Sequence, residues 1–431
     1  MAQGRRGTAS LFDIDLRQGA TGLVLLALVF AAAVATTPAQ AQTFQVIHNF
    51  TGGADGGNPS GRLTIDGGGH IYGTTYSGGI EWPGGPGGVV FKVSPAGSGW
   101  LESPIYSFTQ FSDGDDPAAG AIFGPDGLLY ATTSNGGTVF TLRPAATIPP
   151  SYVSPWTIDY LYDFPLPKDR PAGDLIFDSA GNIYGVTWEG GSDGCFDNQG
   201  CGTVYELTPS GGGGWQETTL YTFQGGADGA YPTGVIFDSA GNLMGTASSG
   251  GTFDYGVIFK LTRSGNSWTE SVLYDFDNEG TGGYQPEAGL ISDGAGNFYG
   301  STLLTPAPTY SGTIFEFSPS NGGWTYTVLA QIPEHYGIGP TEPLTMDNAG
   351  NLYGTIGGFS YSEYPGAVFK VARGSGGWTF TSLHDFTGGD DGDAPASTVA
   401  FGANGNLCGT AAYGGAFCHP DGCGVVWEIT P

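Results

Sequence analysis

The amino-acid sequence predicts an all-β fold, a seven-bladed β-propeller with four antiparallel strands in each blade. Three observations support this prediction. One four-strand unit recurs seven times, no segment after residue 41 shows the periodicity of an amphipathic helix, and the first strand after residue 41 matches the strand that the last unit lacks. Four-stranded units of about 40 to 50 residues are typical of propellers, which close about four to eight blades into a ring.

Tryptophans mark the repeat, at intervals of 53 to 59 residues from Trp100 to Trp378. In the fourth copy we expect strands a, b and c at Val235–Asp238, Asn242–Ala247 and Val257–Leu261, because Val, Ile, Phe and Tyr alternate there between turns rich in Gly, Pro and Asp. Strand d follows each Trp. The repeats are expected at about residues 42–100, 101–156, 157–215, 216–268, 269–324, 325–378 and 379–431.

Two glycines and one aromatic residue recur in every copy. The turn between strands a and b carries a Gly where a left-handed backbone is needed, at Gly69, Gly127, Gly181, Gly241, Gly296, Gly350 and Gly405. A second Gly precedes strand c, at Gly88, Gly137, Gly202, Gly256, Gly312, Gly366 and Gly424. The aromatic residue lies at the centre of strand c, at Phe91, Phe140, Tyr205, Phe259, Phe315, Phe369 and Trp427.

The two ends of the repeat region predict how the ring closes. Thr43–Phe50 matches Thr379–Phe386, which is a strand d, whereas the sequence ends on Val425–Thr430, a strand c. The N-terminal strand is therefore expected to complete the last blade beside the C-terminal strand. Such closure leaves no exposed sheet edge.

Residues 1–41 are expected to form a signal peptide. Arg5, Arg6 and Arg17 supply the basic region, Leu23–Ala35 the apolar region, and Ala39–Ala41 the small-residue cleavage pattern. The apolar stretch is shorter than the about 20 residues of a transmembrane helix, although a retained N-terminal anchor is the alternative. No later segment is apolar enough to span a membrane. We expect an exported protein that is periplasmic, secreted or peripherally attached to the cell surface, and that is a monomer.

The net charge of the chain limits the classes of molecule that it can bind. The formal net charge is −28, and such an excess of acid repels phosphate backbones, so nucleic acid is excluded as a partner. Cations or basic partners suit this charge, and solubility alone also explains it. Aromatic residues make up 13% of the chain, which argues against disorder despite the 79 glycines.

The five cysteines fit an oxidising compartment. Cys195 and Cys201 bracket one Gly-rich loop, and Cys418 and Cys423 bracket the matching loop of the last repeat. Two local disulfides are favoured over one metal site built from four thiolates, because the two pairs belong to different repeats. Cys408 replaces the Tyr or Met of other copies within a strand and is expected to be a buried free thiol.

The motif formed by Leu220–Phe223, Gly225–Pro232, Val235–Asn242 and Val257–Thr262 resembles the bacterial "GloVer" tandem repeats, named from Gloeobacter and Verrucomicrobia. The resemblance covers residues 43–431. It implies an exported propeller, often with a C-terminal surface anchor, which this sequence lacks up to Pro431. The family brings no established reaction, so the resemblance leaves the function open.

The loops predict where a ligand binds. The d–a and b–c loops share one face of a propeller, and here they differ in every copy, whereas the a–b and c–d turns are short and uniform. Variable loops on a rigid scaffold usually carry binding sites. Aromatic and acidic residues there suit sugar rings, although the aromatics also fit a role as fillers between blades. The candidate ligand residues are Tyr76, Trp82, Trp188, Glu189, Tyr255, Tyr413 and His419.

The d–a loops also carry clustered acids. Asp113, Asp115 and Asp116 in one loop and Asp391 and Asp393 in another are weak candidates for Ca²⁺, which takes about six to eight oxygens. No EF-hand spacing is present, so solvated turns are favoured, and we assign no metal and no other cofactor.

Catalytic patterns are weak. The G-x-S-x-G match at Gly190–Gly194 lies in a Gly-rich loop and not on a strand–turn–helix elbow, so no catalytic residue is assigned. Five acids that end strand a, Asp66, Asp178, Asp238, Asp293 and Asp347, are explained by turn formation.

Three functions remain open, because sites and not folds decide activity. The first, which we favour, is a non-catalytic binding or adhesion propeller whose partner is a glycan or an extracytoplasmic protein. The others are a structural or assembly module without a small ligand, and a hydrolase or lyase that acts on polysaccharide. Aromatics clustered around one opening would favour the first, and two buried carboxylates facing each other there would favour the enzyme. Aromatics scattered around the rim would favour the structural module.

Overall fold

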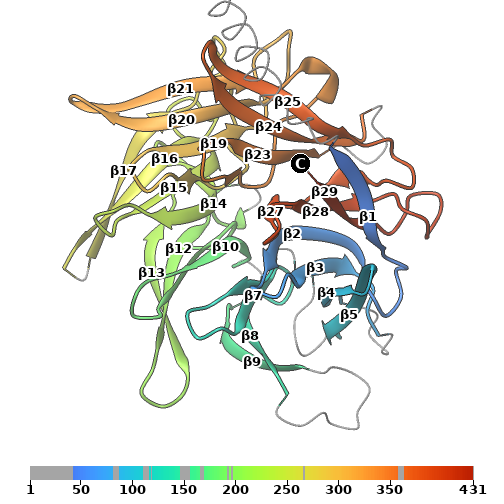
Figure 1. Cartoon of the computed structure of the whole chain (residues 1–431). Coiled ribbons are helices and arrows are strands. Elements are labelled where there is room, and N and C mark those ends of the chain that lie inside the picture. The colour runs from blue at the N-terminus through green and yellow to red at the C-terminus, as the bar shows by residue number, and fades with distance from the viewer. Residues whose placement is uncertain are drawn as a thin grey trace, which may run out of the picture. The chain divides into compact units, whose positions relative to one another are not determined.

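The computed structural model describes residues 42–80, 87–109, 116–117, 119–145, 156–165, 169–191, 194–195, 198–265, 267–357 and 364–430. Residues 44–430 form one compact unit. Its described regular structure is almost entirely β and includes the 3-10 turn η2 (Glu334–Tyr336). The strands form seven antiparallel sheets that follow one another around a common axis (Figure 1). The predicted seven-bladed β-propeller is confirmed.

Each of the first three blades is one sheet of four consecutive strands. Blade 1 contains β2 (Gly57–Ile65), β3 (Ile71–Ser77), β4 (Val89–Ala96) and β5 (Gly99–Ser107). Blade 2 contains β6 (Ile122–Phe123), β7 (Leu129–Thr133), β8 (Thr138–Pro144) and β9 (Trp156–Asp163). Blade 3 contains β10 (Pro171–Phe177), β11 (Ile183–Thr187), β12 (Thr203–Pro209) and β13 (Trp215–Thr222).

Blades 4 to 6 repeat this order from strand a to strand d. Blade 4 contains β14 (Ala230–Phe237), β15 (Leu243–Ser249), β16 (Val257–Ser264) and β17 (Ser267–Asp275). Blade 5 contains β18 (Ile291–Ser292), β19 (Phe298–Thr302), β20 (Thr313–Ser320) and β21 (Gly323–Gln331). Blade 6 contains β22 (Thr345–Met346), β23 (Leu352–Gly357), β24 (Gly366–Gly374) and β25 (Gly377–Asp385).

Blade 7 joins the two ends of the propeller, as the sequence predicts. Its sheet has the order β1-β29-β28-β26, with β27 also paired to β28, so β1 supplies the outer strand (Figure 1). The ring is thereby closed without an unpaired strand c. Its strands are β26 (Asp393–Pro395), β27 (Ala400–Phe401), β28 (Leu407–Tyr413), β29 (Val425–Thr430) and β1 (Thr43–Asn49).

The recurring aromatics form the contacts between blades. The seven aromatic residues at the centre of strand c are fully buried. The Phe that follows strand d of one blade packs edge-on against this ring in the next blade, as Phe223 does on Phe259 with ring centroids 5.0 Å apart. Phe50 makes the same contact with Phe91, at 5.1 Å, across the closure between blades 7 and 1. The core therefore contains a series of blade-to-blade aromatic contacts, interrupted after blade 5, where the buried Ile332 takes the place of the Phe.

The Gly before strand c allows a close approach between blades. An added Cβ at these glycines would lie 2.4 to 2.8 Å from a proline Cδ of the following blade, in the pairs Gly88–Pro117, Gly202–Pro232, Gly256–Pro286, Gly366–Pro395 and Gly424–Pro59. The residue before that proline also donates its N–H to the preceding blade's b–c loop, as Tyr231 does to the Cys201 carbonyl at 2.9 Å. Small residues at this place therefore determine how tightly the blades dock.

The five acids that end strand a form turns, as predicted. One carboxylate oxygen of Asp238 accepts the backbone N–H groups of Ala240 and Asn242, at 2.9 and 2.8 Å. Asp66, Asp178, Asp293 and Asp347 accept the equivalent pairs of N–H groups. Burial acts to raise the pKa of Asp238, but the hydrogen bond from Lys260 at 2.8 Å, together with those from Asn242 and Ala240, lowers it overall.

Acid pairs lie between some blades. Asp55 in the loop before blade 1 accepts hydrogen bonds from Thr51 and lies close to Glu102 of β5. Asp228 before blade 4 accepts the Tyr221 hydroxyl at 2.9 Å and lies close to Glu270 of β17. Burial, and then the neighbouring Asp charge, raises the pKa of Glu102 to about 8 and that of Glu270 to about 7.

The expected cysteine chemistry is present. Cys195 is bonded to Cys201, and Cys418 to Cys423, while Cys408 is a buried free thiol. Burial raises the pKa of the Cys408 thiol to about 12, so this group is unreactive. Within the described ranges, the structure contains no helix with the length and apolar character needed to cross a bilayer.

Candidate functional site

A pocket of about 310 Å³ lies on the axis of the propeller. Residues from blades 1, 2, 3, 5 and 6 line it. Because several of these blades are not neighbours, their residues can meet only at the centre of the ring. The residues come from d–a segments, starts of strand a and b–c loops, so the pocket opens on the predicted ligand face. We call it the mouth pocket, and its polar and aromatic lining includes Arg62, Ser134, Asp174, Trp188, Glu287 and Glu342.

An ion pair forms the inner end of the mouth pocket. The Arg62 guanidinium of blade 1 donates to the Asp174 carboxylate of blade 3 at 2.7 Å. Both residues also line a second cavity of about 280 Å³, whose other residues lie further along strand a, so the pair lies between the two spaces. The Asp174 charge raises the pKa of Arg62, which stays positive.

Strand a reaches the axis through a local irregularity. Gly61 and Gly173, which precede Arg62 and Asp174, have φ of 74° and 63°, in the left-handed region. The pairing with strand b is broken at these points, between Ser60 and Thr64 and between Ala172 and Ile176. Such bulges redirect side chains, and here they bring two opposite charges together across the axis.

Two further carboxyl groups line the mouth pocket. Glu287 precedes strand a of blade 5, and Glu342 precedes strand a of blade 6. Burial, and then the charge of Asp174, raises the pKa of Glu342 to about 8. Burial also raises the pKa of Glu287. Both side chains stay partly accessible from the cavity, so they are available to a ligand.

Trp188 and Glu189 lie at the edge of the mouth pocket, directly after β11. Trp188 lines the pocket, is 39% exposed and stacks on Tyr231 of blade 4, with ring centroids 4.7 Å apart. Glu189 is buried, and its Oε2 lies 3.4 Å from Nε of Arg170. The arrangement presents an aromatic surface beside charged groups.

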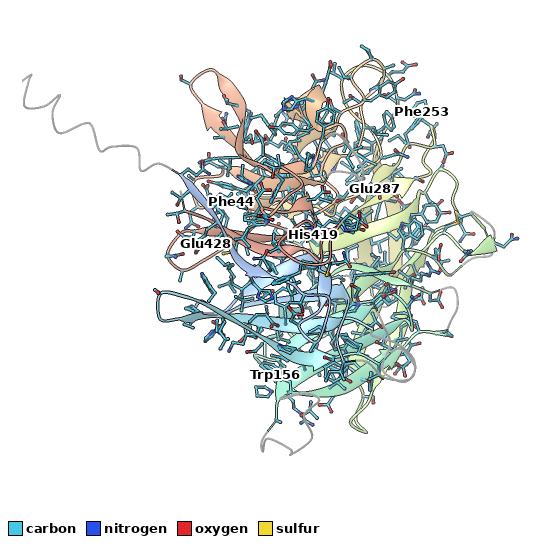
Figure 2. All side chains as sticks on the ribbon, turned by 90° about the vertical axis from the view of Figure 1, so that its right-hand side faces the viewer. Phe44, Trp156, Phe253, Glu287, His419 and Glu428 are labelled. Atoms are coloured by element: carbon cyan, nitrogen blue, oxygen red, sulfur yellow. A yellow bond between two sulfur atoms is a disulfide. The ribbon has the colours of Figure 1, made fainter. Side chains whose placement is uncertain are left out.

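Exposed aromatic side chains gather on the same face. The described residues include eight exposed large hydrophobic side chains, of which only Leu101 and Tyr160 lie on outer strands. The other six lie at the b–c loops of six different blades: Tyr76, Trp188, Phe253, Tyr310, Tyr364 and Phe417. Figure 2 shows Phe253 and Glu287 toward one side of the molecule, with Phe44 and Glu428 toward the other.

The other predicted ligand residues lie apart from the mouth pocket. Tyr76 is exposed and hydrogen-bonds to Asp116. Tyr255 packs on Tyr284, with centroids 4.9 Å apart, and its hydroxyl accepts a hydrogen bond from Asn278. Tyr413 is partly buried at the end of β28, and His419 is exposed in the next loop. Trp82 lies outside the described residues.

The acids predicted as Ca²⁺ candidates make other contacts. Asp116 accepts a hydrogen bond from Asn135 at 2.7 Å, and Asp391 contacts His384 at 3.0 Å. Burial raises the pKa of Asp393. Asp113, Asp115 and Ser192 of the G-x-S-x-G match lie outside the described residues. Within the described part of the chain, no three metal-binding side chains gather.

Sequence reasoning missed Arg62, Asp174, Glu287 and Glu342. A proline recurs before strand a in all seven copies, from Pro59 to Pro395, and most residues in the next three positions are small. The four missed residues are the charged exceptions at those positions. Comparing the repeats column by column would have singled them out.

Fold and pocket define a closed seven-bladed propeller with an accessible axial pocket on its loop face. The chain belongs to the Gloeobacter/Verrucomicrobia repeat family, which matches residues 30–196 and 170–427. No curated protein matches the sequence.

Solved structures share the fold. PorZ, a bacterial surface component of the type-IX secretion system of Porphyromonas gingivalis, is 15% identical with a TM-score of 0.50, over 86% of this chain and 46% of PorZ. A putative oxidoreductase (glucose dehydrogenase) from Thermus is 15% identical with a TM-score of 0.45, over 90% of this chain and 100% of that one. A luciferin-regenerating enzyme is 12% identical with a TM-score of 0.42, over 91% and 96%. At these identities the likeness shows the fold alone.

Proposed function

We propose that this protein is an exported, non-catalytic binding propeller that holds a glycan on its d–a and b–c face. The observation that carries the proposal is the placement of six exposed aromatic side chains at the b–c loops of six blades, one of which, Trp188, lines the axial pocket. Exposed aromatics arranged on one face mark binding surfaces. Their apolar faces suit the C–H faces of sugar rings, and the carboxylates between them accept hydrogen bonds from hydroxyls.

Export is supported by two independent features. Residues 1–41 have the sequence pattern of a signal peptide, and two disulfides close b–c loops on the proposed binding face. Cys195–Cys201 follows Trp188 and Glu189 in the loop of blade 3, so it restrains the segment next to the mouth pocket. The protein then acts in the periplasm, in the medium or at the cell surface.

A glycan array tests the proposal directly. The purified protein is expected to bind a subset of oligosaccharides, and Trp188→Ala is expected to weaken binding about tenfold or more, because a stacked aromatic contributes about 1 kcal/mol or more beyond its buried area. Leu101→Ala, on an outer strand, is the matched control and leaves binding unchanged. If no glycan binds to the folded protein, the proposal fails and the structural-module alternative replaces it.

Polysaccharide cleavage is the second candidate, because Glu287 and Glu342 line one pocket. A carboxyl group with a raised pKa can act as a general acid beside an ionised partner. An enzyme would release new reducing ends from a bound polysaccharide, and Glu342→Gln would abolish that release. A binding protein returns the polysaccharide uncut.

A further inference from the structure

Two carboxyl groups of the mouth pocket have no counter-ion. Glu287 and Glu342 face the cavity, and neither makes a hydrogen bond or ion pair with another residue in the described part of the chain. Carboxylates removed from bulk water are normally paired, because an unpaired charge there is costly. The positive charge that pairs with these two carboxylates would therefore come from a ligand.

The arginines of the mouth pocket are already matched. Arg62 is paired with Asp174 at 2.7 Å, and Arg170 lies 3.4 Å from Glu189. Among the residues that the structure describes, no lysine lines the pocket. Once Glu287 and Glu342 ionise, the pocket carries two uncompensated negative charges. An anionic ligand would meet these charges and would have to displace an existing ion pair, so a cationic ligand fits better.

The protonation of the two groups agrees with a cationic ligand. Burial raises the pKa of Glu287, and burial together with Asp174 raises that of Glu342 to about 8. An entering cation stabilises the ionised form of both groups and lowers their pKa values again. Binding of a cation near pH 7 would therefore release a proton into solution.

Size and aromatic lining restrict the cation further. A volume of about 310 Å³ lies at the lower end of ligand pockets, which span about 300 to 1,000 Å³. Trp188 is held in place by Tyr231 and presents an aromatic surface at the pocket. Such a surface accommodates the apolar face of a sugar ring and also attracts a cation through its π electrons.

We infer that the mouth pocket binds an amino sugar with a free amino group, whose ammonium is attracted by the carboxylates of Glu287 and Glu342 while its ring packs on Trp188. This inference rests on the proposed glycan-binding function and names the chemical class of the ligand. Acetylation of the nitrogen removes the charge, so the N-acetylated sugar loses the contact.

Titration calorimetry with three oligosaccharides of equal length and linkage tests the inference. They consist of β-1,4-linked glucosamine, N-acetylglucosamine and glucose. The glucosamine oligomer is expected to bind about tenfold tighter than the other two. Its affinity should rise between about pH 6 and pH 7, because removing the proton from Glu342 to form the ion pair costs less free energy at the higher pH. Titrations in two buffers with different ionisation enthalpies measure the net proton exchange, which is the proton lost by Glu342 less the proton gained by any unprotonated amino group.

Three variants distinguish the effect of the acids in the mouth pocket from that of an acid elsewhere on the same face. Glu342→Gln and Glu287→Gln keep the side-chain shape and remove one charge each. Each is expected to reduce the preference for glucosamine about tenfold while leaving the glucose oligomer unaffected. Glu279→Gln is the matched control, because Glu279 is an exposed acid in the d–a loop before blade 5 and does not line the pocket.

The outcomes distinguish this inference from the proposed function. Equal affinity for the three oligosaccharides overturns the inference, while glycan binding stands. Failure of every oligosaccharide to bind overturns both. Trilysine that binds as tightly as the glucosamine oligomer, with the same loss in Glu342→Gln, assigns the pocket to a cationic peptide and overturns the amino sugar.

Discussion

Replacing Gly256 with alanine is expected to destabilise the propeller strongly, because this glycine precedes strand c where two blades meet. Its φ is 99°, and an added Cβ would lie 2.6 Å from Cδ of Pro286 in the next blade and 2.6 Å from the Ala247 carbonyl. The backbone conformation alone costs about 1 to 2 kcal/mol for an L-residue. Overpacking adds about 1 to 3 kcal/mol. We expect a total loss of about 2 to 5 kcal/mol in the free energy of unfolding.

The control is Gly241→Ala in the a–b turn of the same blade. Gly241 has a φ of 79°, and nothing lies within 4 Å of an added Cβ, so this variant carries only the backbone cost of about 1 to 2 kcal/mol. Guanidinium titration followed by tryptophan fluorescence measures both variants. Equal losses would refute the reasoning, because the contact with Pro286 would then contribute nothing.

Three further predictions concern stability and closure. Glu102 and Glu270 have raised pKa values in the folded state, so the stability that their protonated forms contribute is lost as the pH rises toward about 8. The melting temperature should therefore be higher at pH 5 than at pH 8.5. The double variant Glu102→Gln with Glu270→Gln should make the melting temperature less dependent on pH. Replacing Cys195 and Cys201 with serine should cost about 2 kcal/mol for so short a loop, and an unchanged unfolding midpoint would contradict this. Deletion of residues 43–49 removes β1 and exposes an edge of β29, so size-exclusion chromatography should show self-association, whereas a stable monomer would contradict the role of β1 in closure.

The fold was predictable because each repeat carries the same physical requirements. Four strands, a left-handed turn glycine and one buried aromatic define the blade, and the match between residues 43–50 and 379–386 predicts closure. The expected start of strand a at Val235 is late by five residues, since β14 begins at Ala230. The irregular pairing between Pro232 and Gly234 hides this part of the strand from a pattern of alternating residues.

The site was predictable only in part. The mouth pocket opens on the face that carries the variable loops, and Trp188 was named because it is an aromatic residue in such a loop. That a ligand binds on this face stays a prediction. Arg62, Asp174 and Glu342 were not named, because they come from three blades and meet only when the ring closes. Charge alone does not reveal which residues of a repeat face the axis, and the signal in the sequence is their position directly after the recurring proline.

A crystal structure with a bound β-1,4-linked glucosamine oligomer tests the central claim most directly. We predict density for one sugar ring against Trp188, with its amino group toward the acidic wall of the mouth pocket that contains Glu287 and Glu342. An oligomer bound at the a–b and c–d turns, on the opposite face of the propeller, would contradict the account.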